Sequence, residues 1–326
     1  MLITVTREPV VESVHHVDAV VAGPSGPRLC WGDPFRPTVA RSGLKLIQAL
    51  PVVRTGAADR FGLSPEELSL SCASHNAEPG HIAAVEAWLA KIGLDPSALE
   101  CGADVPHDGE VLAAHLAAGR GRERVANNCS GKHTGFLTVA RHLGHDHAGY
   151  LSPDHPTMRL VTEAITEVCG IELDDQTPGR DGCGVPTWSI PLADLAGGMA
   201  RLGRPETLDA GWRTAAETIT TAVGPRPWWI SGTGRHEVEV AAVATEPVIL
   251  KGGAEGVFMG AVPAQGLGIA VKVADGAARA AQVAMSAVLA HLGAIPPEAV
   301  GRPVHNVAGR VVGRIDVELT APDVLG

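Results

Sequence analysis

The sequence has no long apolar run and no excess of positive charge. No stretch reaches the roughly 20 uninterrupted apolar residues of a membrane helix. The first residues, MLITVTREPVVES, show no basic segment followed by an apolar one, as a signal peptide would. The formal net charge of −10 disfavours nucleic-acid and acidic-membrane partners, which need clustered positive charge. We therefore expect a cytoplasmic protein that binds neither nucleic acid nor membrane.

Lysine is scarce, and the cysteines follow no disulfide pattern. Most of the 26 basic residues are arginines, and the lysines are Lys45, Lys91, Lys132, Lys251 and Lys272. A buried lysine can lose its proton and act as a base, whereas arginine cannot, so the remaining lysines are candidates for chemistry. The six cysteines form no C-x-x-C pair, and in a chain this long they do not suggest a disulfide framework.

Strand-like segments lie towards both ends of the chain. Residues 2–22 alternate apolar and polar side chains and predict two or three short strands, followed by a loop over 23–37 that is rich in Gly and Pro. Later in the chain, strands are predicted over 237–250, 257–263, 267–273 and 303–318, and an alanine-rich helix over 277–292.

Helical patterns fill the middle of the chain, from about residue 60 to about residue 225. Ser64-Pro65-Glu66-Glu67 is typical of a helix start, with Pro at the first helical position. A short helix over 42–50 is expected to stop at Pro51. Other predicted helices follow Pro79, up to Gly93, and cover 131–143, 156–168, 190–202 and 206–223. We predict an α/β protein of the α+β type, a single unit over residues 1–326. Its N- and C-terminal parts form one antiparallel sheet with flanking helices, beside the helical region.

Ser42 and Lys45 form an S-x-x-K motif at a predicted helix start. Residues three apart on a helix lie on one face, about 5–6 Å apart at Cβ. A serine hydroxyl is a weak nucleophile that needs a base, and a buried lysine with a lowered pKa can be that base. The alternative is a capping serine beside a solvated lysine, because S-x-x-K arises by chance in many chains.

Two further segments support a serine–lysine site. Ser71-Cys-Ala-Ser74-His75-Asn76 follows an apolar stretch, and Lys251-Gly-Gly253 follows the apolar segment 247–250. Taken alone, each is also compatible with an ordinary turn. Their order after S-x-x-K matches that of serine β-lactamases and penicillin-binding proteins. Lys272, on another predicted strand, stays open as an alternative partner for Ser74.

A third cluster combines thiols, an amine and a carboxylate. Asn128-Cys129-Ser-Gly-Lys132 is followed much later by Asp181-Gly-Cys183. Two thiols with an amine and a carboxylate can bind zinc, although lysine must first lose its proton. The alternative is a pair of buried structural cysteines.

These motifs together resemble the asparaginase II-like family, also called class 3 L-asparaginases. The resemblance runs along nearly the whole chain. Its segments are Glu12-Ser-Val-His15, Arg41-Ser42-Gly-Leu-Lys45, Ser71-Cys-Ala-Ser74-His75-Asn76, Asn128-Cys129-Ser-Gly-Lys132-His133, Asp181-Gly-Cys183-Gly-Val-Pro186 and Lys251-Gly-Gly253-Ala-Glu-Gly256.

The resemblance implies a fold similar to serine β-lactamases and glutaminases, and a homodimer. It implies two Ser–Lys pairs, Ser42 with Lys45 and Ser74 with Lys251. It also implies one zinc per chain on Cys129, Lys132 and Cys183, with Asp181 near the metal. The substrate-binding residues are then expected to be Arg41, His75, Asn76 and Gly253.

From these observations we expect an L-asparaginase that forms an acyl-enzyme on Ser42 and releases L-aspartate and ammonia. Backbone amides near Ser42 and Gly253 would hold the oxyanion. A glutaminase, or another serine–lysine amidohydrolase of β-lactamase-like fold, would use the same residues. A binding protein without activity is the remaining alternative, because fold does not imply function.

Overall fold

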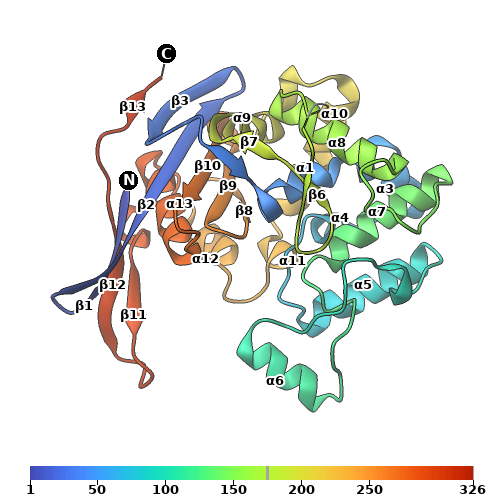
Figure 1. The fold of residues 1–326 in the computed structure, drawn as a ribbon, viewed down its shortest axis with the longest axis horizontal. Coiled ribbons are helices and arrows are strands. Elements are labelled where there is room, and N and C mark those ends of the chain that lie inside the picture. Colours follow the sequence, from blue (N-terminus) through green and yellow to red (C-terminus); the bar gives the residue numbers. More distant parts are fainter. Residues whose placement is uncertain (174–175, 326) are drawn as a thin grey trace.

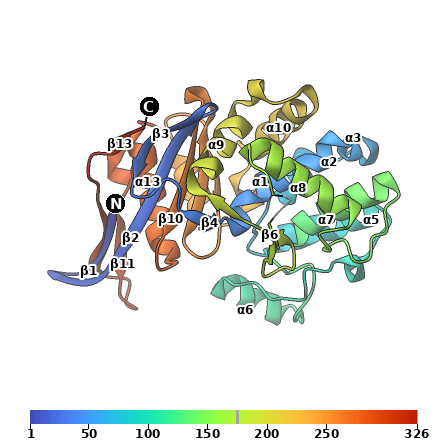
Figure 2. The same cartoon turned by 45° about the horizontal axis from the view of Figure 1, so that its top comes forward.

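A sheet and a helical region lie side by side in the computed structural model, which describes residues 1–173 and 176–325 (Figure 1). Both early and late segments of the chain enter the sheet, whereas the middle of the chain forms most of the helical region. The view in Figure 2 shows the same division.

Nine strands of the described part form one antiparallel sheet. Seven of them follow the order β11-β12-β1-β2-β10-β9-β8, and β3 pairs with β2 and β13. The strands are β1 (Leu2–Arg7), β2 (Val10–Gly23), β3 (Gly26–Trp31), β8 (Ile249–Gly252), β9 (Val257–Val262), β10 (Leu267–Val273), β11 (Arg302–His305), β12 (Val311–Glu318) and β13 (Asp323–Val324). Because β1 pairs with β12 and β2 with β10, the predicted joining of N- and C-terminal strands is confirmed.

Helices cover both faces of the sheet. Helix α9 (Leu192–Gly203) packs on one face and α13 (Ala278–His291) on the other. Successive strand residues point to opposite faces, so in β10 Ile269 and Val271 join the apolar core under α13. Ala270 joins the core shared with the helical region. Gly268 lets α9 lie very close, since a Cβ there would stand 2.1 Å from the carbonyl oxygen of Ala196.

The helical region surrounds the buried helix α7 (Ser130–Leu143). Its other helices are η1 (Arg41–Leu44), α1 (Lys45–Gln48), α2 (Leu50–Arg54), α3 (Ala57–Phe61), α4 (Pro65–Ser71), α5 (Pro79–Lys91), α6 (Gly109–Ala117), α8 (Pro156–Cys169), α10 (Ala210–Val223) and α11 (Pro227–Ile230). Helix α4 begins with a capping box, in which Ser64 and Glu67 each accept a hydrogen bond from the other's backbone amide. Every helix in the described residues is too short or too polar to cross a lipid bilayer.

The structure corrects four predicted elements. The segment 237–250, expected to be one strand, forms helix α12 (His236–Val243) and then β8. Pro51 does not end a helix but lies in the first turn of α2. The expected loop over 23–37 contains β3, and the expected strand over 303–318 is a hairpin of β11 and β12. Short strand pairs, β4 (Pro37–Val39) with β7 (Ser189–Pro191) and β5 (Gly179–Arg180) with β6 (Pro186–Thr187), complete the fold.

Candidate active site

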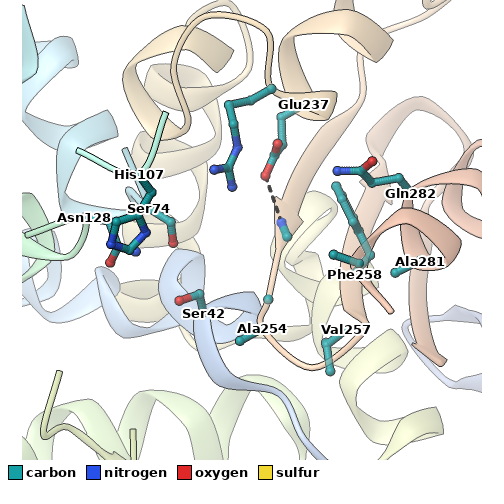
Figure 3. Close-up of a pocket in the computed structure, with 14 residues that line it drawn as sticks. Ser42, Ser74, His107, Asn128, Glu237, Ala254, Val257, Phe258, Ala281 and Gln282 are labelled. Atoms are coloured by element: carbon teal, nitrogen blue, oxygen red, sulfur yellow. Dashed lines mark hydrogen bonds between the residues drawn. The ribbon is translucent and has the colours of Figure 1, made fainter. Parts of the chain in front are cut away.

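A cavity of about 250 Å³ lies between the sheet and the helical region. Segments distant in sequence meet there: η1, the loop after α4, the start of α12, the end of β8 and one side of α13 (Figure 3). The backbone of Gly252 and Gly253 lines the cavity, together with the polar side chains of Ser42, Ser74, His107, Asn128, Arg235, Glu237 and Gln282. The cavity therefore brings Ser42, Ser74 and Gly253, three of the predicted site residues, onto one surface.

Ser74 is held between two buried lysines. The Lys45 Nζ donates to the Ser74 Oγ at 2.8 Å and to the carbonyl of Ala73 at 2.6 Å. From the other side, the Lys251 Nζ lies 3.0 Å from the same Oγ and donates to the Gly252 carbonyl at 2.9 Å. Both lysine side chains are 0% exposed. Proton transfer between either amine and the Ser74 hydroxyl thus needs no movement of the chain.

Burial shifts both amines toward the neutral state, because a charged group loses its hydration in the protein interior. Burial lowers the pKa of Lys251 to about 7, and the nearby Glu237 carboxylate opposes that shift. The pKa of Lys45 is also lowered, mainly by burial and against the influence of Cys129. Near neutral pH, Lys251 is therefore present in both protonation states, as a general base requires.

Ser42 lies on a tight turn against the end of β8. The preceding Arg41 has a positive φ of 51°, a backbone conformation that is strained for any residue other than glycine. Gly253 permits the contact between the two segments, since a Cβ there would lie 2.7 Å from the Ala40 carbonyl oxygen. Within the described residues, the Ser42 hydroxyl forms no hydrogen bond, and Lys45 bonds to Ser74 instead. The hydroxyl of the candidate nucleophile is thus free to contact a substrate in the cavity.

At the end of β8, the structure bears on the expected role of the Gly253 amide and on the choice between Lys251 and Lys272. The Gly253 amide, expected to face an oxyanion, donates to the Val257 carbonyl at 2.9 Å. Gly253 therefore allows close packing at the site, but its amide is not a free hydrogen-bond donor. Lys272 donates to the carbonyl of Glu255, so Lys251 is the strand lysine that contacts Ser74.

Arg41 and His75 are engaged within the protein. Arg41 forms an ion pair with Asp181. The His75 ring is buried. Its Nδ1 accepts from the amide of Ala77 at 3.0 Å, and its Nε2 lies 2.9 Å from the Ser130 Oγ. Burial lowers the pKa of His75 well below its usual value, so the ring is neutral. His75 therefore fixes the backbone next to Ser74 without exposing a nitrogen to the cavity.

Asn76 supports the loop that precedes α12. Its Nδ2 donates to the Thr233 carbonyl at 3.0 Å, and its Oδ1 accepts from Arg235 at 3.4 Å. Glu78 holds the same loop by accepting from the Thr233 amide at 2.7 Å and from its hydroxyl at 2.8 Å. The loop is thereby fixed against the Ser74 segment.

A pair of thiols lies behind the two serines. The Lys45 Nζ is 3.0 Å from the Cys129 Sγ, and the Lys132 Nζ is 3.1 Å from the Cys183 Sγ. Hydrogen bonding from Cys129, with help from Lys132 and against burial, lowers the pKa of Cys183 to about 4. The same bond and burial raise the pKa of Cys129 to about 12. One of the two sulfurs is thus a thiolate at neutral pH.

The thiol pair matches part of the donor set expected for zinc. Lys132 contacts Cys183, and both lie close enough to Cys129 to shift its pKa. Soft sulfur ligands suit zinc better than calcium or magnesium. Asp181 lies close enough for Lys132 to lower its pKa, but its carboxylate is paired with Arg41. In the part of the chain that the structure describes, no three His, Cys, Asp or Glu side chains converge. The fit therefore depends on the Lys132 amine as third ligand.

Arg235, Glu237, His107 and Gln282 line the cavity but were not singled out from the sequence, whereas Asn128 belongs to the thiol motif. Glu237 was hidden because 237–250 predicts a strand, whereas Arg235 and Glu237 lie at the start of helix α12. A usable signal was present in the glycines just before it. Gly232 and Gly234 both have positive φ, which a sharp turn toward the cavity requires.

Comparison with family models gives a match over nearly the whole chain. A family model described as L-asparaginase II matches residues 3–317. Among solved structures, a beta-lactamase from Mycobacterium bovis is similar over 84% of this chain and 94% of its own, at 18% identity and a TM-score of 0.41. A protein named Mglu, in its tris and glutamate form, is similar over 90% of this chain and 63% of its own, at 18% identity and a TM-score of 0.39. The curated proteins contain no match.

Proposed function

The chain belongs to the L-asparaginase II family and is an amidohydrolase, and on that premise we propose that it hydrolyses L-asparagine to L-aspartate and ammonia. The observation that carries the proposal is Ser74 between the buried amines of Lys45 and Lys251, beside Ser42 in one cavity. Serine hydroxyls next to amines of lowered pKa are suited to acyl transfer.

In the proposed reaction, the Ser42 Oγ attacks the side-chain amide carbon of the substrate. Lys45 takes the Ser42 proton and hands it to Ser74, while Ser74, poised by Lys251, passes its own hydroxyl proton to the departing amide nitrogen, which leaves as ammonia. Water then attacks the Ser42 ester. It releases aspartate and returns the hydroxyl proton to Ser42. The contacts of Ser74 with both amines support this path.

The Ser42 amide, at the start of the 3₁₀ turn, is the proposed oxyanion donor on this side of the cavity. The backbone of Gly252 and Gly253 forms the wall opposite. Without side chains at these positions the substrate can approach the main chain closely.

We also propose that Cys129, Cys183 and Lys132 hold one zinc ion per chain. Bound there, zinc would supply a positive charge behind the two serines. Binding would displace the protons of Cys129 and Lys132, so zinc affinity should rise with pH.

The test is ammonia release from L-asparagine and L-glutamine by one preparation at one pH. A cavity that fixes the α-amino and α-carboxylate groups places the amide carbon of only one of the two substrates at Ser42. One extra methylene is worth roughly 10- to 200-fold in kcat/KM, and we expect the preference to favour asparagine. A ratio near one, or in favour of glutamine, would make the protein a glutaminase with the same Ser42 chemistry. No release from either amide would contradict the proposal.

A further inference from the structure

The start of α12 carries two opposite charges on one wall of the cavity. Arg235 is the residue before the helix, and Glu237 lies in its first turn. Both line the cavity that contains Ser42 and Ser74. Building on the proposed function, we infer that Glu237 binds the α-amino group and Arg235 the α-carboxylate of the substrate. The substrate class is then a free α-amino acid amide, because a residue within a peptide has neither charge.

Glu237 is a buried carboxylate with one oxygen occupied. The residue is only 3% exposed, and its Oε1 accepts from the Gly252 amide at 3.0 Å. Figure 3 shows this bond and the carboxylate beside the cavity, with the Ser42 and Ser74 hydroxyls across from it. Lys251 and Arg235 lower the pKa of Glu237 against the effect of burial, so the group stays ionised. Among the described residues its second oxygen has no hydrogen bond, which leaves it to accept from a ligand ammonium group.

Arg235 is a cation without a carboxylate partner in the described part of the chain. Its one side-chain hydrogen bond found there is the 3.4 Å contact to the Asn76 Oδ1. Most of the guanidinium donors therefore remain available, and their planar arrangement fits a carboxylate with two parallel bonds.

The loop that carries the two charges is fixed before any ligand binds. Glu78 and Asn76 hold Thr233 through three hydrogen bonds. At Gly232 a Cβ would lie 2.6 Å from the Glu78 Oε1, so the loop packs closely against the residue that precedes α5. A rigid pair of unlike charges suits a ligand that carries its own unlike charges on one carbon, because little ordering is left to be done on binding.

The experiment crosses two variants with two substrate analogues. Succinamic acid is asparagine without the amino group, and β-alaninamide is asparagine without the carboxylate. For Glu237→Gln we expect kcat/KM to fall about 10- to 100-fold for asparagine and β-alaninamide but less than about threefold for succinamic acid. For Arg235→Gln we expect the same loss for asparagine and succinamic acid, with β-alaninamide spared.

Glu239→Gln is the matched control, since Glu239 lies on the same helix but contacts Arg302 outside the cavity. We expect it to leave all three substrates unchanged. If Glu237 acts only by tuning Lys251, Glu237→Gln will lower all three values equally and move the pH profile. That result overturns the inference. Glu237→Asp, which keeps the charge, should recover part of the discrimination, and thermal unfolding checks that each variant is folded.

Failure of the proposed function gives a different pattern. If the wild type releases no ammonia, calorimetric binding of L-aspartate and of succinate to the same variants replaces turnover. If Glu237→Gln, but not the other variants, no longer binds L-aspartate more tightly than succinate, the result would still support the amino-group site. Equal binding of both ligands by the wild type would overturn it.

Discussion

The charge on Lys251 determines which proton transfers the site can perform. In the unfolded chain this amine has a pKa of 10.5, and in the folded protein burial lowers it to about 7. The neutral amine, which can accept a proton, is therefore the minor form below pH 7 and the major form above it.

We predict that kcat/KM for asparagine rises with pH through about 7 and then levels off. Below that point the slope should approach tenfold per pH unit, because the neutral fraction of Lys251 changes by that factor. The measurement is a pH–rate profile from about pH 5.5 to 9. A flat profile across neutral pH would show that turnover does not require neutral Lys251, and Lys251→Arg should remove whatever rise is seen.

Substitution of Ser42 and Lys45 tests the acyl-enzyme directly. We predict that Ser42→Ala abolishes turnover with the fold intact, because the proposed nucleophile is gone. Lys45→Arg should be nearly as damaging as Lys45→Ala, at least about 10²-fold in kcat, since arginine keeps the charge but cannot accept a proton. Steady-state ammonia release measures both. An Arg variant with most of the activity would make Lys45 an electrostatic partner only.

At the scale of elements, local signals predicted most helices correctly. Helix α4 follows from its capping residues and Pro65, and α5 from the apolar face that includes Trp88. The segment of α12 was predicted as a strand because Glu237-Val-Glu-Val240 alternates polar and apolar side chains. In the structure Glu237 and Val240, three apart, are both buried, as on one face of a helix. Tertiary packing therefore selected the helical spacing over the alternating pattern of a strand.

The cap of α4 offers a test of stability that is separate from catalysis. Ser64 accepts from the Glu67 amide, and Glu67 accepts from the Ser64 amide and from Lys91. We predict that Ser64→Ala lowers the free energy of unfolding by about 1 kcal/mol and leaves kcat unchanged. Denaturant unfolding measures the change, with Ser152→Ala at an exposed position as control. An effect on kcat without loss of stability would contradict a purely local role.

The thiol pair joins the N-terminus of α7 to the turn between β5 and β6, through Cys129 and Cys183. We predict one zinc per chain in protein purified without chelator, by elemental analysis. Cys129→Ser and Cys183→Ser should each lose it, whereas Cys169→Ala, at a buried thiol elsewhere, should keep it. Zinc content unchanged in Cys129→Ser, or absent after zinc supplementation, would restore the interpretation of buried structural cysteines.

At the scale of the whole molecule, the homodimer stays a prediction that follows from the family resemblance. We expect light scattering to give twice the 33.6 kDa mass of the chain. The mass should not change with tenfold dilution if the dimer is obligate. A mass of one chain at micromolar concentration would contradict the expectation.

The motifs of the site were visible in the sequence, but most of their partners were not. Ser42 and Lys45 are three residues apart, so helical spacing predicts their proximity. The contact of Lys45 with Ser74, and of both with Lys251, depends on packing between segments far apart in the chain. Order along the chain and family resemblance brought these residues together, whereas Arg235 and Glu237 carried no motif of their own.

The long strand β2 imposes an order of events on the synthesis of the protein. Its partners β1 and β3 lie next to it in the sequence, whereas β10, which pairs with its other edge, is synthesised much later. About 240 residues separate Gly23 from Leu267, the end of one strand and the start of the other. At about 5–20 residues per second, the nascent chain presents that edge for roughly 10 to 50 seconds on the ribosome. An unpaired apolar edge invites pairing with other chains, so chaperone supply during translation should limit the yield of soluble enzyme in a cell.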